Sequence, residues 1–449
     1  MKSRSRGNFP YKLIALKILF VLFLFPLTLS AQTIKEEVLP NGLKVIVIED
    51  RNAPVATFQI WYRVGSRNEY IGKTGISHLL EHMMFKGTHK YGKGALSKTV
   101  QRAGGIVNAY ITKDYTVYYQ KLSPDRIDIF LEFESDRMQN LIIDERETLA
   151  ERNVVIEERR LMIEDNPQRL VYEGVVAAAF KNHPYRWPVI GWMSDIEGIT
   201  RDELWNYYRT YKAPNNAVII VAGNVKPEVV IEKINDAFGH IPRGPERTDA
   251  RISEPPQRGE RRIYVKKEAE LPYVLAAYKV PNILDKDSYA LEVLESILAE
   301  GKSARIYKSL IHEKQLCQSA GAWYGGFYRD PFLFFLYGTA APGKSIEDVE
   351  QALYAEIEKI KQTPPSEREV QRAKNQLEAA FIMGQDSISF QVRVIGMFEM
   401  IESWRLKDRY IEGIRKVTPE DVQAVARKYL VEDQRTVGIL IPVKNQNPK

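Results

Sequence analysis

Apolar and polar residues alternate or recur along the chain in patterns that predict strands and helices in mixed order. Segments 43–50 (LKVIVIED) and 56–66 (ATFQIWYRVGS) predict strands, and the alternating segment 108–123 (NAYITKDYTVYYQKLS) predicts another. Apolar residues at helical spacing predict helices over 75–85 and 125–140. This mixed order indicates an α+β fold in which a sheet packs against helices.

The pattern recurs after 218 residues. Thr200 and Thr418 each precede a helical segment, in the position where threonine caps a helix, and they are 218 residues apart. Tyr211 and Tyr429, near the ends of these segments, share the offset, and a β-branched run follows each as a buried strand. We therefore predict two homologous α/β-sandwich domains related by an internal repeat.

The middle of the chain contains a segment that reads as a linker. Residues 241–262 are rich in proline and charge and have no apolar periodicity. A chain of 449 residues is also too long for one ordinary core. We predict a first domain at 32–240 and a second at 263–449.

Residues 1–31 have the layout of a secretory signal peptide. A basic head precedes an apolar run from Ile18 to Leu29, and the small residues Ser30 and Ala31 follow. An uncleaved anchor is the alternative, but this run is shorter than the roughly 20 residues that span a bilayer. We expect cleavage near Gln32, no stable membrane span afterwards, and a location in the periplasm.

Composition agrees with a folded protein and excludes some classes. The chain is 44% hydrophobic and 27% charged, close to ordinary globular values. Its 64 basic and 58 acidic residues are spread along the chain, so the charge gives no reason to expect a nucleic-acid partner. The single cysteine, Cys317, excludes an intrachain disulfide and a thiol-rich metal site.

Two histidines and a glutamate, His78, Glu81 and His82, fall within five residues, although the chain has only six histidines. On a helix all three share one face and can reach one point in space, and two imidazoles at this spacing can bind zinc. The alternative is a pair of histidines on a helix surface. His89 and His183 lie near a helix end and in a proline-containing turn, so we predict structural roles for them.

Four stretches in a fixed order carry a family resemblance. They are HLLEH (78–82), GGIVNAYITKDYTVYY (104–119), ERNVVIEE (151–158) and NHPYRWPVIG (182–191). In motifs, order and separation the chain resembles the pitrilysin, insulysin and mitochondrial processing peptidase family of zinc metallopeptidases, which has the inverted His-x-x-Glu-His motif. The resemblance covers nearly the whole mature chain.

The resemblance implies one zinc ion per chain, held by His78, His82 and Glu158. Glu81 would act as general base toward the water that zinc activates, and Glu151 would orient a ligand. Glu157 competes with Glu158 by chain distance. On a helix, however, Glu158 returns to the face of Glu151, whereas Glu157 points about 100° away.

In this family the substrate adds an extended strand to a sheet edge beside the zinc, and the matching residues are Asn108, Ala109 and Tyr110. Strand addition supplies backbone hydrogen bonds without demanding a sequence. The implied substrates are peptides or unfolded polypeptides. The alternative is that this aromatic-rich segment is only a structural strand.

The second half departs from the family pattern. It has no histidine pair at the corresponding place, and where self-sufficient members carry an arginine and a tyrosine seven residues later, it has Ile311 and Gln318. Arg305 and Tyr324 are nearby, but their spacing does not fit. We therefore expect the chain to be the zinc-bearing subunit of a dimer, either with a homologous subunit that carries the arginine and tyrosine or with a second copy.

Together these features predict a secreted zinc-dependent endopeptidase. One alternative is a non-catalytic, zinc-containing assembly subunit of the same fold. Another is a periplasmic peptide-binding module with structural zinc, although structural zinc sites usually have four protein ligands and favour cysteine.

Overall fold

The computed structural model describes residues 33–51, 53–246 and 252–443. The predicted signal peptide at 1–31 lies outside these residues. Within the described part of the chain, no helix is both long enough and apolar enough to cross a membrane.

The first half of the chain builds a six-stranded sheet with the order β1-β2-β6-β3-β5-β4. β2 runs parallel to β6, whereas β6 with β3, β3 with β5 and β5 with β4 pair antiparallel. β4 therefore lies at an edge of the sheet. The strands are β1 (Thr33–Val38), β2 (Lys44–Glu49), β3 (Ala56–Tyr62), β4 (Ile106–Ile111), β5 (Thr116–Leu122) and β6 (Ala217–Gly223).

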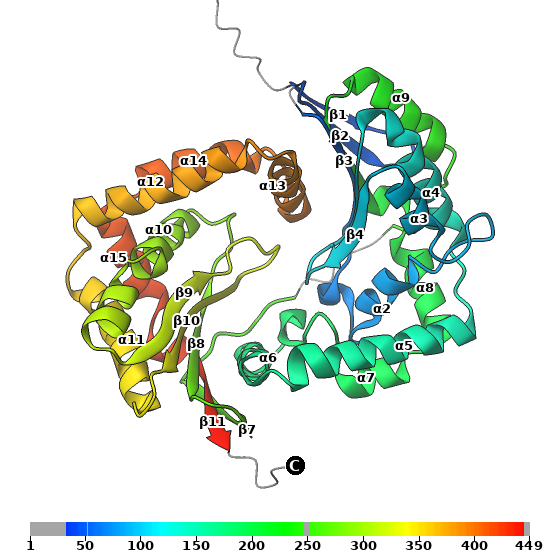
Figure 1. Ribbon diagram of the computed structural model, residues 1–449. Helices are drawn as coiled ribbons and strands as arrows, with labels where there is room; N and C mark the ends of the chain where they lie inside the picture. The colour runs from blue at the N-terminus through cyan, green and yellow to red at the C-terminus, as the bar shows by residue number, and fades with distance from the viewer. Residues whose placement is uncertain (1–32, 52, 247–251, 444–449) are drawn as a thin grey trace, which may run out of the picture. The chain divides into compact units, whose positions relative to one another are not determined.

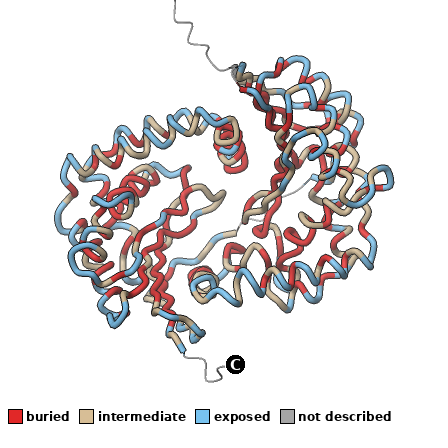
Figure 2. Tube along the Cα trace, viewed as in Figure 1, coloured by how far each residue is buried: buried red, intermediate tan, exposed pale blue. Residues whose placement is uncertain are grey.

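Helices cover one face of this sheet and share a core with it. Their apolar residues, among them Leu79, Phe130 and Phe238, are fully buried against strand residues such as Phe58. Figure 2 shows buried segments along the inner side of these elements. The helices are α2 (Ile76–Met83), α3 (Ala95–Arg102), α4 (Ile127–Asn140), α5 (Glu145–Arg159), α8 (Arg201–Tyr211) and α9 (Pro227–Phe238), with the short α7 (Met193–Gly198) beside α5.

The second half builds a five-stranded sheet with the order β7-β11-β8-β10-β9. β7 is parallel to β11 and the other neighbours are antiparallel, which is the pattern of β2-β6-β3-β5-β4. The strands are β7 (Arg261–Glu268), β8 (Tyr273–Val280), β9 (Cys317–Tyr324), β10 (Phe332–Ala340) and β11 (Arg435–Val443). Its helices are α10 (Asp287–Ala299), α11 (Ile346–Gln362), α12 (Glu367–Gly384), α14 (Leu406–Lys416) and α15 (Pro419–Tyr429).

The internal repeat and the fold class are thereby confirmed. Thr200 and Thr418 both cap a helix, and each side-chain oxygen accepts a hydrogen bond from the third residue of its helix while that residue's carboxylate accepts one from the threonine N–H. The chain folds as two homologous α/β sandwiches.

One helix from each half packs on the sheet of the other half. α6 (Pro167–Ala179) lies on β7, β8 and β11, where Val171 and Val175 join the apolar cluster of Leu275 and Leu440. α13 (Ile388–Ile401) lies on β3 and β6 and contributes to the cluster around Trp61 (Figure 1). Each sheet is thus covered on its second face by a helix from the other repeat.

Two local expectations differ from the structure. The segment 108–123 forms the hairpin β4–β5 instead of one strand, because the Thr112 side chain accepts hydrogen bonds from the N–H groups of Asp114 and Tyr115, both at 3.1 Å, and closes a turn. β7 begins at Arg261, within the last two residues of the range predicted as linker.

Candidate metal centre

The helix that carries both histidines starts at a constrained point. Gly75, just before α2, has φ of +89°, and a Cβ atom there would collide with the carbonyl oxygen of Ile190. The Glu69 carboxylate accepts hydrogen bonds from the N–H groups of Gly75 and Ser77, both at 2.9 Å. Burial raises the pKa of Glu69 to about 8, against the effect of these bonds. The first turn of α2 is thereby held in place.

His78 and His82 face α5 and meet one of its glutamates. Glu158 Oε2 lies 3.8 Å from His78 Nε2 and 3.4 Å from His82 Nε2. The three ligand atoms all lie within 4.8 Å of one another. Glu157 instead points to solvent and pairs with Arg160.

This arrangement fits a zinc ion. Zinc–nitrogen distances of 2.0–2.1 Å in a tetrahedron place neighbouring ligand atoms roughly 3.4 Å apart. The separations to Glu158 are 3.4 and 3.8 Å, so small side-chain shifts would complete the shell. Two imidazoles and one carboxylate with a fourth position free is the ligand set of catalytic zinc.

His82 is held by a second carboxylate. Its Nδ1 lies 2.9 Å from Glu151 Oε1, and Lys86 forms an ion pair with the same glutamate. Burial opposes the charged forms, but these contacts outweigh it: the pKa of Glu151 falls to about 2 and that of His82 rises to about 9. Such carboxylate–histidine pairs orient metal ligands. Lys86 was not predicted from the sequence, although its position four residues after His82 was a usable signal.

His78 is held in the opposite protonation state. Burial and the neighbouring His82 lower its pKa to about 4, although Glu158 opposes this shift. His78 is therefore neutral at ordinary pH, and the neutral imidazole is the form that binds a metal.

Glu81 lies beside this cluster with its Oε2 4.0 Å from His78 Nε2. Burial raises the pKa of Glu81, and the positive charges of His82 and Lys212 offset only part of that rise. A carboxylate in such a partly dehydrated position accepts a proton more readily than a fully hydrated one.

A buried lysine that was not predicted from the sequence, Lys212, lies close to Glu81. Lys212 donates to the Tyr118 hydroxyl at 3.1 Å, and its ammonium lies 4.1 Å from the ring centroid of Tyr62. Burial pushes the pKa of Lys212 well below its ordinary value. The sequence gives no local signal for this lysine, since it comes close to Glu81 only through the packing of α8 under the sheet.

Hydrogen bonds of Arg159 join the C-terminal end of α5 to the 182–191 segment. Arg159 binds Glu173 through two hydrogen bonds of 2.9 Å and donates another, at 2.8 Å, to the carbonyl oxygen of Gly191. These hydrogen bonds of the Arg159 guanidinium hold the last turn of α5 in place, and Glu158 lies in that turn.

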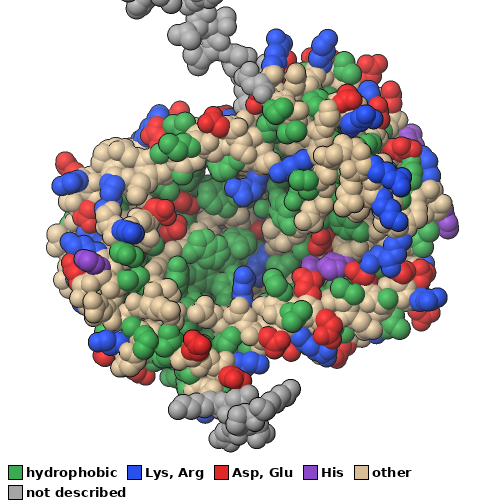
Figure 3. Space-filling view, in the orientation of Figure 1, with side chains coloured by type: hydrophobic (Ala, Val, Ile, Leu, Met, Phe, Trp, Pro, Cys, Tyr) green, Lys and Arg blue, Asp and Glu red, His purple; other side chains and the backbone are tan. Residues whose placement is uncertain are grey.

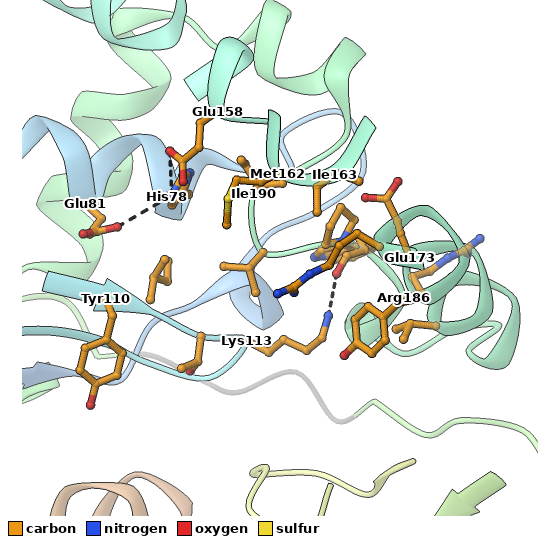
Figure 4. Close-up of a pocket in the computed structure, with 18 of the residues that line it drawn as sticks. His78, Glu81, Tyr110, Lys113, Glu158, Met162, Ile163, Glu173, Arg186 and Ile190 are labelled. Carbon is orange, nitrogen blue, oxygen red and sulfur yellow. Dashed lines mark hydrogen bonds and ion pairs between the residues drawn. The ribbon is translucent and has the colours of Figure 1, made fainter. Parts of the chain in front are cut away.

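A cavity of about 500 Å³ opens beside the cluster (Figure 4). His78, Glu81 and Glu158 lie at one end, and Met162 and Ile190 belong to its apolar lining. Of the three residues predicted to contact substrate, Tyr110 lines this cavity, whereas Asn108 and Ala109 lie on the edge strand β4 outside its lining.

Other predicted positions lie away from the cluster. His89 is exposed in a loop, and His183 is buried, where it contacts Asp330 at 3.1 Å and accepts from the Tyr185 N–H. Ile311 packs against the second core, and Gln318 is exposed in β9.

Comparison with known proteins identifies relatives over nearly the whole chain. The family model for insulinase, peptidase family M16, matches residues 44–191, and that for the peptidase M16 inactive domain matches residues 198–377. A Helicobacter pylori protein named zinc protease PqqE is 32% identical, covering 90% of this chain and 92% of that protein.

Two further relatives agree. An Arabidopsis thaliana protein named probable mitochondrial-processing peptidase subunit beta is 28% identical over 93% of this chain and 80% of its own length. The crystal structure of a protease from Helicobacter pylori superposes with a TM-score of 0.88 at 31% identity, covering 92% of this chain and all of that one. The chain belongs to the insulinase family, peptidase family M16, whose relatives named here include zinc proteases.

Proposed function

We propose that this chain is a zinc-dependent endopeptidase with one zinc ion held by His78, His82 and Glu158. The observation that carries the proposal is the convergence of these three side chains, whose ligand atoms lie within 4.8 Å of one another, with the Glu81 carboxylate beside them. A site with three ligands and an adjacent carboxylate suits hydrolysis better than structural support.

A bound zinc ion supplies a Lewis acid that lowers the pKa of water to about 7 and polarises a carbonyl group. Glu81 accepts the proton of the attacking water and then donates it to the leaving amine. Glu151 keeps His82 in a fixed orientation through the 2.9 Å contact with Nδ1.

The edge strand β4 offers the place for an extended substrate. β4, which carries Asn108, Ala109 and Tyr110, has no strand of the described chain on its outer side, and Tyr110 borders the cavity at the metal cluster. The Ala109 N–H donates to the Asn108 side-chain oxygen at 2.8 Å, a bond that a paired peptide would replace. Pairing through the backbone suits peptides and unfolded polypeptides of varied sequence.

Two further parts of the proposal concern location and assembly. The basic and apolar N-terminal segment supports secretion into the periplasm. Ile311 and Gln318 provide neither a guanidinium nor a phenol, which supports a dimer in which a homologous subunit supplies an arginine and a tyrosine. A homodimer is the other form of this assembly.

Paired variants on α5 test the metal site. Glu158→Gln should lower zinc affinity by more than the roughly 10- to 100-fold that loss of an orienting contact costs. Glu157→Gln, one residue away and exposed, should bind zinc as the wild type does. Equal zinc affinity of the two variants, measured by competition with a chromogenic chelator, would remove Glu158 from the site.

Purification of the chain without any partner tests the assembly. The two-subunit form predicts weak or no cleavage by the zinc-loaded chain alone and recovery when the homologous subunit is added. Full activity of a homodimer, with its mass measured by light scattering, would reject the two-subunit form and leave the zinc peptidase proposal intact.

A further inference from the structure

A second groove lies on the face of the first sheet that is opposite to the metal helix. It has a volume of about 470 Å³ and is formed where the start of α13 leaves part of β3, β4 and β5 uncovered. Its lining includes Tyr110, Tyr119, Lys121, Phe390 and Arg393. Figure 3 shows a hollow in the viewed face of the molecule, with hydrophobic side chains inside and Lys and Arg side chains at its margin.

The charged groups that line this groove are all cations. Arg393 is exposed and lies 5.5 Å from the ring centroid of Phe390, and neither it nor Lys121 has an ion-pair partner among the described residues. No carboxylate of the described chain lines the groove. Two uncompensated cations beside aromatic rings give a site complementary to an acidic group with an apolar stem.

Tyr110 lines both this groove and the metal cavity, so the two lie on either side of the edge strand β4. On β4, Val107 and Ala109 pack toward the helix-covered core, whereas Tyr110 packs toward Trp61 and Tyr119 on the opposite face. A peptide added to this edge would alternate in the same way, because successive side chains of a strand point to opposite faces. Every second side chain would therefore face the groove.

We propose that the groove binds an acidic side chain of the peptide substrate, with Arg393 as the main determinant of this preference. The inference rests on the proposed peptidase function and adds a substrate class to it: extended peptides with Asp or Glu at a position whose side chain faces α13. Lys121 on β5 assists from the floor of the groove.

The test compares peptides that differ in one charge. Quenched fluorescent peptides with Glu or Gln, scanned through positions on both sides of the cleaved bond, are given to the zinc-loaded protein, with its partner subunit if one is required. Glu should raise kcat/KM by about fivefold at one or two alternate positions, the scale of a solvent-exposed ion pair, and salt should weaken the preference.

Variants then test whether Arg393 causes the preference for Glu. Arg393→Gln should abolish the Glu preference, so that the Glu and Gln peptides are cleaved with equal kcat/KM, and Arg393→Glu should favour a Lys peptide. Arg209→Gln, an exposed arginine on α8 outside the groove, is the matched control and should keep the preference. A Glu preference that persists in Arg393→Gln, or no preference at any position, would overturn the proposal.

Failure of this inference differs from failure of the peptidase proposal. If no peptide is cleaved, the peptidase function fails. Binding of the same labelled peptides to the Glu81→Gln protein, followed by fluorescence anisotropy, then tests the groove by itself. Equal affinity for Glu and Gln peptides in that measurement would reject the groove as an acidic subsite.

Discussion

His82 lies between two carboxylates, and this position ties metal binding to pH. Glu151 contacts its Nδ1 at 2.9 Å and Glu158 contacts its Nε2 at 3.4 Å. Burial lowers the pKa of His82, but the two carboxylates reverse this and raise it to about 9. A metal ion needs the neutral imidazole, so zinc must displace a proton at neutral pH.

Zinc affinity should therefore rise with pH up to about 9. The pKa of His82 is raised in the folded, metal-free protein, so the protonated imidazole stabilises that form. This stabilisation is complete below the unfolded pKa of about 6.5. It is lost as pH rises through about 9. Calorimetry in buffers of different ionisation enthalpy should show at least about one proton released per zinc at pH 7, nearly one of them from His82.

A variant of Glu151 tests whether the raised pKa of His82 causes the proton release. Glu151→Gln should lower the pKa of His82, so that fewer protons are released at pH 7. Zinc affinity that does not change between pH 7 and 9 in the wild type would contradict the proposed link.

Local spacing predicted the cluster but not its surroundings. Helical phase is a short-range property, so the pairing of His78 with His82 and the choice of Glu158 over Glu157 could be made from the sequence and the family resemblance. Lys212 reaches Glu81 only through the folded sheet, and no spacing rule relates residues so far apart in the chain.

Among the helices and strands, α6 and α13 are exchanged between the halves: each packs on the sheet of the other half. This packing depends on close contact at glycines. A Cβ atom on Gly396 of α13 would overlap the indole of Trp61, and one on Gly438 of β11 would lie 2.5 Å from Val175 of α6. Each exchanged helix thus approaches its sheet where a side chain is missing. Trp61 is fully buried in this contact.

Gly396→Ala should destabilise the protein despite the better helix propensity of alanine. Overpacking costs about 1–3 kcal/mol, more than the roughly 0.5–1 kcal/mol that Gly to Ala contributes within a helix. Urea unfolding measures the difference. Gly198→Ala at the end of α7, with nothing within 4 Å of the new Cβ, is the control. Equal stabilities of the two variants would contradict this packing account.

The repeat could be predicted from the sequence because helix caps and buried strands leave local signals. The packing of α6 and α13 on the sheet of the other half could not be predicted. The apolar residues of each helix show that one of its faces is buried, but they do not show which sheet covers that face. The hairpin was read as one strand because the alternation continues through 112–115, where the Thr112 side chain closes a turn.

At the scale of the whole molecule, polar contacts join the two halves alongside the exchanged helices. Arg67 and His183 from the first half both bind Asp330 of the second. Burial works against ionisation, but these two partners lower the pKa of Asp330 to about 2. Lys44 and Arg63 likewise pair with Glu399, at 2.9 and 2.8 Å.

Neither half should fold independently. A fragment of residues 32–246 would expose the apolar face of α6 and the sheet face around Trp61, which α13 covers in the full chain. We expect this fragment to aggregate or to unfold without cooperativity in urea, and to recover a cooperative transition when mixed with residues 252–449. Cooperative unfolding of the fragment alone would contradict this interdependence.

The proposed role of Glu81 as the base at a zinc-dependent peptidase site can be tested by one paired measurement. Zinc content and peptide cleavage are measured on the same samples of the wild type and of Glu81→Gln, with the partner subunit present if the activity requires it. We expect one zinc ion per chain in both proteins, with cleavage only in the wild type. Cleavage by Glu81→Gln at the wild-type rate, or zinc binding by a wild type that cleaves no peptide, would contradict it.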